Sequence, residues 1–395
     1  MTGPLTSLRI LDFTTLLPGP FATMYLADLG ADVLRIEAPN RPDIVRISPP
    51  YVEDNISAAH ATLNRSKRSL ALNLKHPDAP SIVKRLVKDY DIVIEQFRPG
   101  VMDRLGVGYE SLKAENPRLI YCAITGYGQT GPYASRAGHD SNYLALAGIM
   151  SYSGRQDTGP HPHGAQIADI GGGSFGAMVG ILAAVIHRQL TGEGQLIDVS
   201  MTDGALAWNA VTGAEYLGGA ELPTYENRLL NGGSHYNYYR TADGRYLSVS
   251  SLEPQFWHGF CEAIERPDLI DQVTKPGEGM RPIREEIAKV IACRTLADWE
   301  AFFEQVDVCV EAVLTLDEVV EHPLTQAREM VVDVKGEKGS TRQIANPLKL
   351  SKTPPEYRYY GVALGHHTQE VMSELGFTEA EIQGFAESGM FGQRE

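Results

Sequence analysis

Strand and helix signals alternate over the first 125 residues, and this alternation constrains the fold more than any other feature of the sequence. Short apolar runs typical of buried strands lie at 8–14, 32–39, 69–74, 91–97 and 118–125. Segments with helical spacing lie between them at 18–31 and 79–90. Such alternation is typical of a parallel sheet with helices on both faces. The sequence therefore predicts an α/β domain built on a parallel sheet.

The loops after the predicted strands indicate where a ligand would bind. Ligands of open parallel sheets lie at the carboxyl ends of the strands. The loops expected there are rich in glycine or proline, as loops shaped around a ligand tend to be. They are 16–20, 37–40, 97–100 and 126–132.

Asp169 precedes an unusual run of glycines. Gly171, Gly172 and Gly173 follow it and lead into a long apolar helical segment. A helix N-terminus favours negative charge, so Asp169 could be a plain capping residue. Capping does not explain three consecutive glycines, each of which is costly in a helix. We interpret the glycines as a place where another group approaches the backbone closely.

His139 stands before another apolar, helix-like run, in the stretch AGHDSNYLALAG. Taken alone, it is most simply an incidental loop residue before a helix that Asp140 or Ser141 would cap. Further along, residues 236–250 alternate aromatic and β-branched side chains around Asp243-Gly244, which is typical of a hairpin. This hairpin is predicted to begin a second, smaller α+β domain.

Charge and composition restrict the classes of partner. A chain of 395 residues suggests two or three domains. Its net charge of −15 argues against general nucleic-acid binding, which needs basic surface. An anionic ligand would need a local basic pocket. One basic cluster is a candidate, either for that pocket or for a solvated loop: Arg65, Lys67, Arg68 and Lys75.

The sequence also indicates the cellular compartment in which we expect the protein. Its first residues lack the pattern of a signal peptide, and no apolar run approaches the 18 residues expected of a membrane span. The four cysteines are far apart and form no CxxC pair. This spacing argues against a disulfide framework or a zinc site and fits a reducing cytoplasm. We therefore expect a cytoplasmic protein that binds neither a membrane nor a metal.

Several long motifs, in order, resemble the class III CoA-transferase (CaiB/BaiF) family, which also contains the α-methylacyl-CoA racemases. They include LRILDFTTLLPGPFATMYLADLGADVLRIEAP, EQFRPGVMDRLGVGYESL, YGQTGPYASRAGHDSNYLALAG, ADIGGGSFGAMVGILAA, TADGRYLSVSSLEPQFW and GHHTQEVMSELG. The resemblance implies a large Rossmann-like CoA-binding domain and a small α+β domain, joined by two linkers, in an interlocked homodimer. The corresponding boundaries are 1–200 for the N-terminal part of the large domain, 201–225 for a linker, 226–325 for the small domain, and 326–395 for a linker and the C-terminal return to the large domain.

The resemblance also implies roles for residues. The aspartate at the position of Asp169 is a nucleophile in the transferases and an acid/base in the racemases. Racemases carry the GHD motif that includes His139, and a glutamate at the position of Glu253 near that histidine. The arginine at the position of Arg98 lies at the CoA-binding end of the sheet. Ala38 stands where some racemases have an arginine, so we expect contacts to the nucleotide end to fall to Arg35, Lys75 or the cluster at 64–68 instead. The predicted CoA-binding residues are Arg98, Lys75, Arg35, Asn73 and Leu72.

Together these features predict an acyl-CoA racemase or epimerase acting on 2-methyl or 2-aryl acyl-CoA in lipid metabolism. His139 and Asp169 would exchange protons on opposite faces of the α-carbon, with Glu253 orienting His139 or raising its pKa. The helix start at Gly171 and Gly172 would hold the thioester oxygen. CoA is part of the substrate, so no separate cofactor is expected.

Three alternatives remain. CoA transfer with Asp169 as the nucleophile is the nearest. A nicotinamide dehydrogenase is disfavoured because no GxGxxG follows the first strand. A non-catalytic CoA-binding protein is disfavoured because the set of His139, Asp169 and Glu253 is complete.

Overall fold

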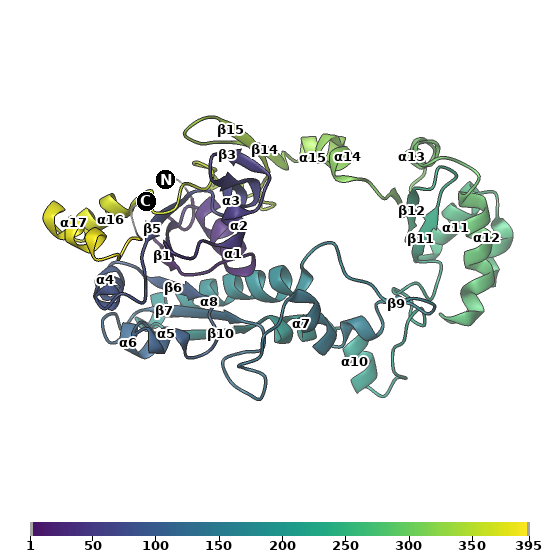
Figure 1. Ribbon diagram of the computed structural model, residues 1–395. Helices are drawn as coiled ribbons and strands as arrows, with labels where there is room; N and C mark the ends of the chain where they lie inside the picture. The colour runs from purple at the N-terminus through teal and green to yellow at the C-terminus, as the bar shows by residue number, and fades with distance from the viewer. Residues whose placement is uncertain (1–2, 393–395) are drawn as a thin grey trace. The chain divides into compact units, whose positions relative to one another are not determined.

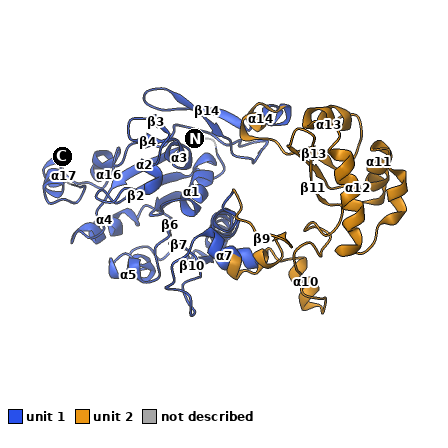
Figure 2. Ribbon diagram, turned by 45° about the vertical axis from the view of Figure 1, so that its right-hand side comes forward, with its two compact units in different colours: residues 1–144, 165–207, 323–395 blue, residues 145–164, 208–322 orange. Residues whose placement is uncertain are grey.

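The computed structural model describes residues 3–392, and the chain divides into two compact units (Figures 1 and 2). Unit 1 combines Met1–Leu144, Ala165–Ala207 and Pro323–Glu395. Unit 2 combines Ala145–Gly164 with Trp208–His322. Unit 2 therefore contains residues 226–322 of the segment assigned to a small domain from sequence, together with 145–164 and 208–225, whereas 323–325 belong to unit 1.

Unit 1 is built on a six-stranded sheet in which every neighbouring pair is parallel, in the order β10-β7-β6-β1-β2-β5. This confirms the predicted parallel sheet. Its outer strand β10 escaped the sequence analysis because Leu196 and Asp198 are exposed, so the strand has no continuous apolar run. The strands are β1 (Arg9–Asp12), β2 (Asp32–Glu37), β5 (Lys67–Ala71), β6 (Ile92–Glu95), β7 (Ile120–Thr125) and β10 (Leu196–Ser200).

Helices bury this sheet. Strand residues such as Leu11, Leu34 and Val93 belong to one buried cluster with apolar side chains of α4 and of the C-terminal helices α16 and α17. Elsewhere α1 packs on β1 and β2, and α8 packs on β7 and β10. The helices are α1 (Pro18–Asp28), α4 (Ala79–Leu86), α8 (Gly176–Thr191), α16 (Thr368–Glu374) and α17 (Glu379–Glu387). Burial of each large apolar side chain contributes roughly 1.5–3 kcal/mol.

A π-helical segment, η2 (Ala168–Phe175), runs directly into α8. By length and composition the combined helix, Ala168–Thr191, could cross a membrane. The search for apolar runs missed it because glycine and serine interrupt its first turns. This helix packs on the sheet and α1, and 44% of its most apolar window is buried.

Unit 1 also contains shorter elements, of which α7 extends into unit 2 at Ala145. They are α2 (Ile44–Ile47), β3 (Tyr51–Glu53), β4 (Ile56–Ser57), α3 (Ala58–Leu63), α5 (Val101–Arg104), α6 (Tyr109–Lys113), α7 (Asp140–Leu146), α9 (Met201–Ala207), α15 (Pro323–Ala327), β14 (Val331–Lys335) and β15 (Ser340–Ile344).

A buried ion pair ties the C-terminal stretch of unit 1 to its N-terminal part. Arg65 Nη2 lies 2.8 Å from Asp28 Oδ2, and neither side chain is exposed. Arg65 Nη1 also donates to the carbonyl of Ile344 at 2.8 Å, and Asn346 donates to Asp28. Residues far apart in the sequence therefore complete one polar cluster.

Unit 2 contains a three-stranded antiparallel sheet in the order β11-β12-β13. Asp243-Gly244 forms the turn between β11 and β12, with Gly244 at φ 80°, so the predicted hairpin is confirmed. Helices close a core around Trp257, Phe260 and Trp299. The main elements are β11 (Asn237–Arg240), β12 (Tyr246–Val249), α11 (Pro254–Ala263), α12 (Arg281–Ile291), α13 (Leu296–Phe303), β13 (Val310–Ala312) and α14 (Leu316–Glu321).

Candidate active site

A cavity of about 420 Å³ lies within unit 1, at the carboxyl ends of β1, β6 and β7. Three of the four loops predicted to surround a ligand contribute to it, through Leu16 and Pro18, Phe97 to Pro99, and Gly126. His139 and Asp169 line the same cavity. Its volume falls in the range typical of small-molecule sites.

Asp169 lies in the first turn of η2, so its predicted position at a helix start is confirmed. Asp140 Oδ1 accepts hydrogen bonds from the backbone N–H groups of Ala168 at 2.7 Å and Asp169 at 3.0 Å. Burial raises the pKa of Asp169 to about 6, the negative charge of Asp140 adds to this rise, and His139 partly offsets it. The carboxyl of Asp169 is thus able to hold or release a proton near neutral pH.

His139 immediately precedes α7. Its backbone N–H donates to Asn142 Oδ1 at 3.0 Å, and its carbonyl accepts from the Asn142 N–H at 2.8 Å. The sequence suggested Asp140 or Ser141 as the cap of this helix, but Asn142 makes the side-chain contact and Asp140 serves η2 instead. Tyr143 donates to the carbonyl of Gly138 at 2.5 Å. The backbone of the GHD stretch is therefore held from both sides of the histidine.

Gly172 of η2 has a structural explanation, which it shares with Gly204 of α9. A Cβ added at Gly172 would lie 2.7 Å from the carbonyl oxygen of Met201, and one added at Gly204 would lie 2.4 Å from the Cα of Gly172. The expected close approach is thus made by the backbone of α9. The thioester-oxygen site at Gly171 and Gly172 stays a prediction, and Asp140 occupies the N–H groups at the start of this helix.

Of the predicted CoA-binding residues, Arg98 is the one that the structure brings to the cavity, where its side chain is exposed. Asn73 and the exposed Lys75 follow β5 and do not line this cavity, whereas Leu72 is part of the buried core. Arg35 is only 2% exposed, and its guanidinium lies 2.6 Å from Asp43. Direct contact of these four with CoA stays a prediction.

Three residues of the basic cluster form ion pairs with carboxylates of the same chain. Arg65 pairs with Asp28, and Lys67 Nζ lies 3.3 Å from Asp12 Oδ2, all four side chains being buried. Burial lowers the pKa of Lys67 to about 8, against the opposing effect of Asp12. Arg68 contacts Asp32, Glu370 and Glu374. Lys75 alone of the four is exposed.

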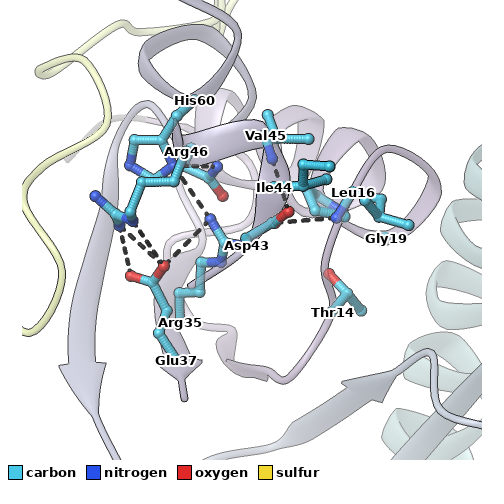
Figure 3. Close-up of polar contacts among 12 residues, drawn as sticks. Thr14, Leu16, Gly19, Arg35, Glu37, Asp43, Ile44, Val45, Arg46 and His60 are labelled. Carbon is cyan, nitrogen blue, oxygen red and sulfur yellow. Dashed lines mark hydrogen bonds and ion pairs between the residues drawn. The ribbon is translucent and has the colours of Figure 1, made fainter. Parts of the chain in front are cut away.

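Sequence reasoning missed how the loop between β1 and α1 is held. Leu16 has φ 61°, a conformation that L residues rarely adopt and that costs about 1–2 kcal/mol. Its N–H donates to Asp43 Oδ2 at 3.0 Å. Figure 3 shows Asp43 between Leu16 and Arg35. An apolar leucine gives no sequence signal for a positive φ, so this contact could not be predicted.

Glu253 lies at the N-cap of α11 in unit 2 and is exposed. His139 and Asp169 belong to unit 1, so the nearness of Glu253 to His139 stays a prediction. Over residues 3–392, no group of three or more His, Cys, Asp and Glu side chains is placed to hold a metal ion. The cavity thus offers an imidazole, a carboxyl group of raised pKa and two arginines, Arg98 and Arg136.

Comparison with known proteins identifies the class to which this fold and site belong. The sequence model of CoA-transferase family III matches residues 5–368. The chain belongs to this family, as the resemblance of its motifs predicted. A CaiB/BaiF family protein from Brucella suis has the same fold, with a TM-score of 0.83 and 30% identity over 95% of this chain and all of that one.

Relatives with different activities are similarly close. The chain is 36% identical to α-methylacyl-CoA racemase of Homo sapiens, over 96% of this chain and 95% of the relative. It is 35% identical to succinate–glutarate CoA-transferase of Agrobacterium fabrum, over 94% of this chain and 96% of the relative. Sequence similarity therefore supports an enzyme of this family that acts on acyl-CoA, without separating the two activities.

Proposed function

We propose that the chain is an acyl-CoA racemase or epimerase that inverts the 2-position of 2-methyl or 2-aryl acyl-CoA thioesters. The observation that carries the proposal is that His139 and Asp169 line one cavity, with the pKa of Asp169 raised to about 6. Inversion by 1,1-proton transfer needs two groups that each hold a proton in turn. A transferase needs Asp169 as a nucleophile but has no such need for His139.

The proposed reaction passes through an enolate. One of the pair, in its basic form, removes the α-proton, and the electrons of the C–H bond move into the thioester to form the enolate. The other, in its acidic form, then delivers a proton to the opposite face of the α-carbon. The enzyme ends with its proton on the first group, and no bond to CoA is broken. General acid/base catalysis of this kind typically contributes about 10²–10⁴-fold.

The test measures deuterium entry at Cα of 2-methylacyl-CoA in D₂O, together with the intact mass of the enzyme. We expect deuterium incorporation, no covalent adduct, and no movement of CoA to an added carboxylate. His139→Ala should abolish most of the inversion at the 2-position, because one face then lacks its acid/base. A CoA thioester on Asp169 with transfer to the added acid and no exchange at Cα would establish the transferase instead, since covalent catalysis requires that intermediate.

We also propose that the chain forms a homodimer. Several apolar side chains of α8 are exposed in the single chain, including Val179 at 67%, Ile186 at 59% and Leu190 at 82%. Exposed apolar side chains in a row along a helix are typical of a surface covered by a partner. The interlocked arrangement implied by the resemblance is part of this proposal. Light scattering that gives the mass of one chain would refute it.

A further inference from the structure

The loop between β1 and α1 forms one wall of the candidate active site, through Leu16 and Pro18. Leu16 adopts φ 61°, a backbone conformation that is strained for leucine. Such a conformation persists only where its surroundings hold it. The N–H of Leu16 donates to Asp43 Oδ2 (Figure 3), so Asp43 is the group that holds it.

Asp43 is fixed in turn by a row of buried charges. The same Oδ2 accepts from Arg35 Nη2 at 2.6 Å, and Oδ1 accepts from the N–H of Val45 in α2 at 3.0 Å. Arg35 Nη1 lies 3.6 Å from Glu37, and Glu37 lies 2.7 Å from Arg46. The four charged side chains are at most 5% exposed. The carboxylate that reaches Leu16 therefore has little freedom to turn away.

The other end of the loop is joined to the helix that carries Asp169. The N–H of Gly19 donates to Gln96 Oε1 at 3.0 Å. Ser174 Oγ lies 2.6 Å from the carbonyl oxygen of Pro18 and 3.2 Å from that of Asp169. The position of the loop is thus defined relative to Asp169 as well as to Asp43.

We propose that Asp43, supported by Arg35, is a positioning residue that shapes the acyl part of the active site by holding Leu16. The proposal rests on the proposed acyl-CoA function. In this role Arg35 acts through Asp43 and contacts no ligand, which differs from the direct CoA contact that the sequence analysis predicts. The loop lines the same cavity as His139 and Asp169. Displacement of the loop should therefore impair binding of the acyl group more than binding of the nucleotide part of CoA.

The test compares Asp43→Ser with Ser57→Ala. A serine at 43 keeps an oxygen that can cap α2, but it is too short to reach Leu16 and Arg35. Ser57 donates to the carbonyl of Val45 in the same short helix and accepts from the His60 N–H, so Ser57→Ala loosens this region without releasing Leu16. For each variant we would measure kcat/KM for exchange at Cα of long and short acyl-CoA, and Kd for free CoA.

We expect Asp43→Ser to lower kcat/KM for the long acyl-CoA by about tenfold or more, since small displacements near the reacting groups are costly. Kd for free CoA should stay within about threefold of the wild-type value. Ser57→Ala should leave the ratio of long to short acyl-CoA unchanged. Equal losses in acyl-CoA turnover and CoA binding would overturn the proposal and make Asp43 a purely structural residue.

Two further results keep the inference separate from its premises. A wild-type protein that catalyses neither exchange nor transfer would refute the proposed function rather than the role of Asp43. If Asp43→Ser does not fold, hydrogen exchange of the Leu16 amide in the wild-type protein decides the matter. A protected amide supports the hydrogen bond to Asp43, and exchange at the rate of an unstructured loop overturns it.

Discussion

At the scale of single residues, Asp140 influences both the backbone position and the pKa of Asp169. Its carboxylate is bonded to two N–H groups at the start of η2 and adds negative charge beside Asp169. Both effects act on Asp169. The hydrogen bonds fix its backbone, and the negative charge of Asp140 contributes to the raised pKa of its carboxyl group. Asp140 was expected only as a helix cap, and its contacts link it to the proposed chemistry.

The pH dependence of the reaction follows from this arrangement. In the proposed mechanism, the active enzyme carries one proton on the pair formed by His139 and Asp169. With the pKa of Asp169 raised to about 6, kcat/KM should fall below about pH 6, because Asp169 is then protonated and cannot act as a base. The same acid limb should appear in both directions, because the two forms of the enzyme differ only in which group holds the proton.

Asp140→Asn provides the matched variant. Asparagine keeps an oxygen that accepts from Ala168 and Asp169 but removes the negative charge. The pKa of Asp169 should fall, so the acid limb of the kcat/KM profile should move to lower pH. Profiles of wild type and variant, measured by exchange at Cα, check this. An acid limb that stays in place or moves to higher pH would contradict the assignment.

At the scale of elements, the contact between η2 and α9 positions the helix that carries Asp169. Gly172 and Gly204 let the two backbones approach more closely than any residue with a Cβ would allow. This contact explains two of the glycines of the region without a ligand. The packing of η2 on α9 therefore requires glycine at both positions.

Gly172→Ala should destabilise the protein by about 1–3 kcal/mol, since the added methyl group would meet the backbone of α9. Gly384→Ala is the control, because Gly384 is also helical but has no atom within 4 Å of an added Cβ. It should stabilise α17 by roughly 0.5–1 kcal/mol through helix propensity. Thermal unfolding of both variants measures the difference. Equal effects would show that the contact between η2 and α9 is not tight.

The sequence predicted elements better than contacts between them. Buried strands of the sheet were found because their apolar runs are continuous, and β10 was missed because one side of it is exposed. Asp169 was placed correctly at a helix start because its local pattern is sufficient. Asp43 and the pairing of Arg65 could not be found, since their partners Leu16 and Asp28 are distant in sequence and only the fold brings them together.

At the scale of the whole molecule, the buried pair formed by Arg65 and Asp28 has hydrogen bonds to Ile344 and Asn346, which connect the N-terminal part of unit 1 to its C-terminal stretch. Removal of one partner leaves a buried charge without compensation, which costs roughly 3–5 kcal/mol. We therefore expect Arg65→Met to lower the denaturant midpoint strongly. Arg281→Met is the control, because Arg281 and Glu278 form an exposed pair of the kind that contributes about 1 kcal/mol or less. Similar midpoints for both variants would contradict the importance of the buried pair.

The hydrogen bond from Arg65 to Ile344 has a consequence for the order of folding during synthesis. During synthesis Arg65 leaves the ribosome 279 residues before the carbonyl of Ile344 that it binds. At about 5–20 residues per second this interval is on the order of 15–60 s. During this interval the nascent N-terminal segment has charged side chains that are buried in the folded protein. Its sheet also lacks the C-terminal helices α16 and α17. Unit 1 is therefore completed only when its last stretch emerges, and a chaperone that shields the early segment would act within this interval.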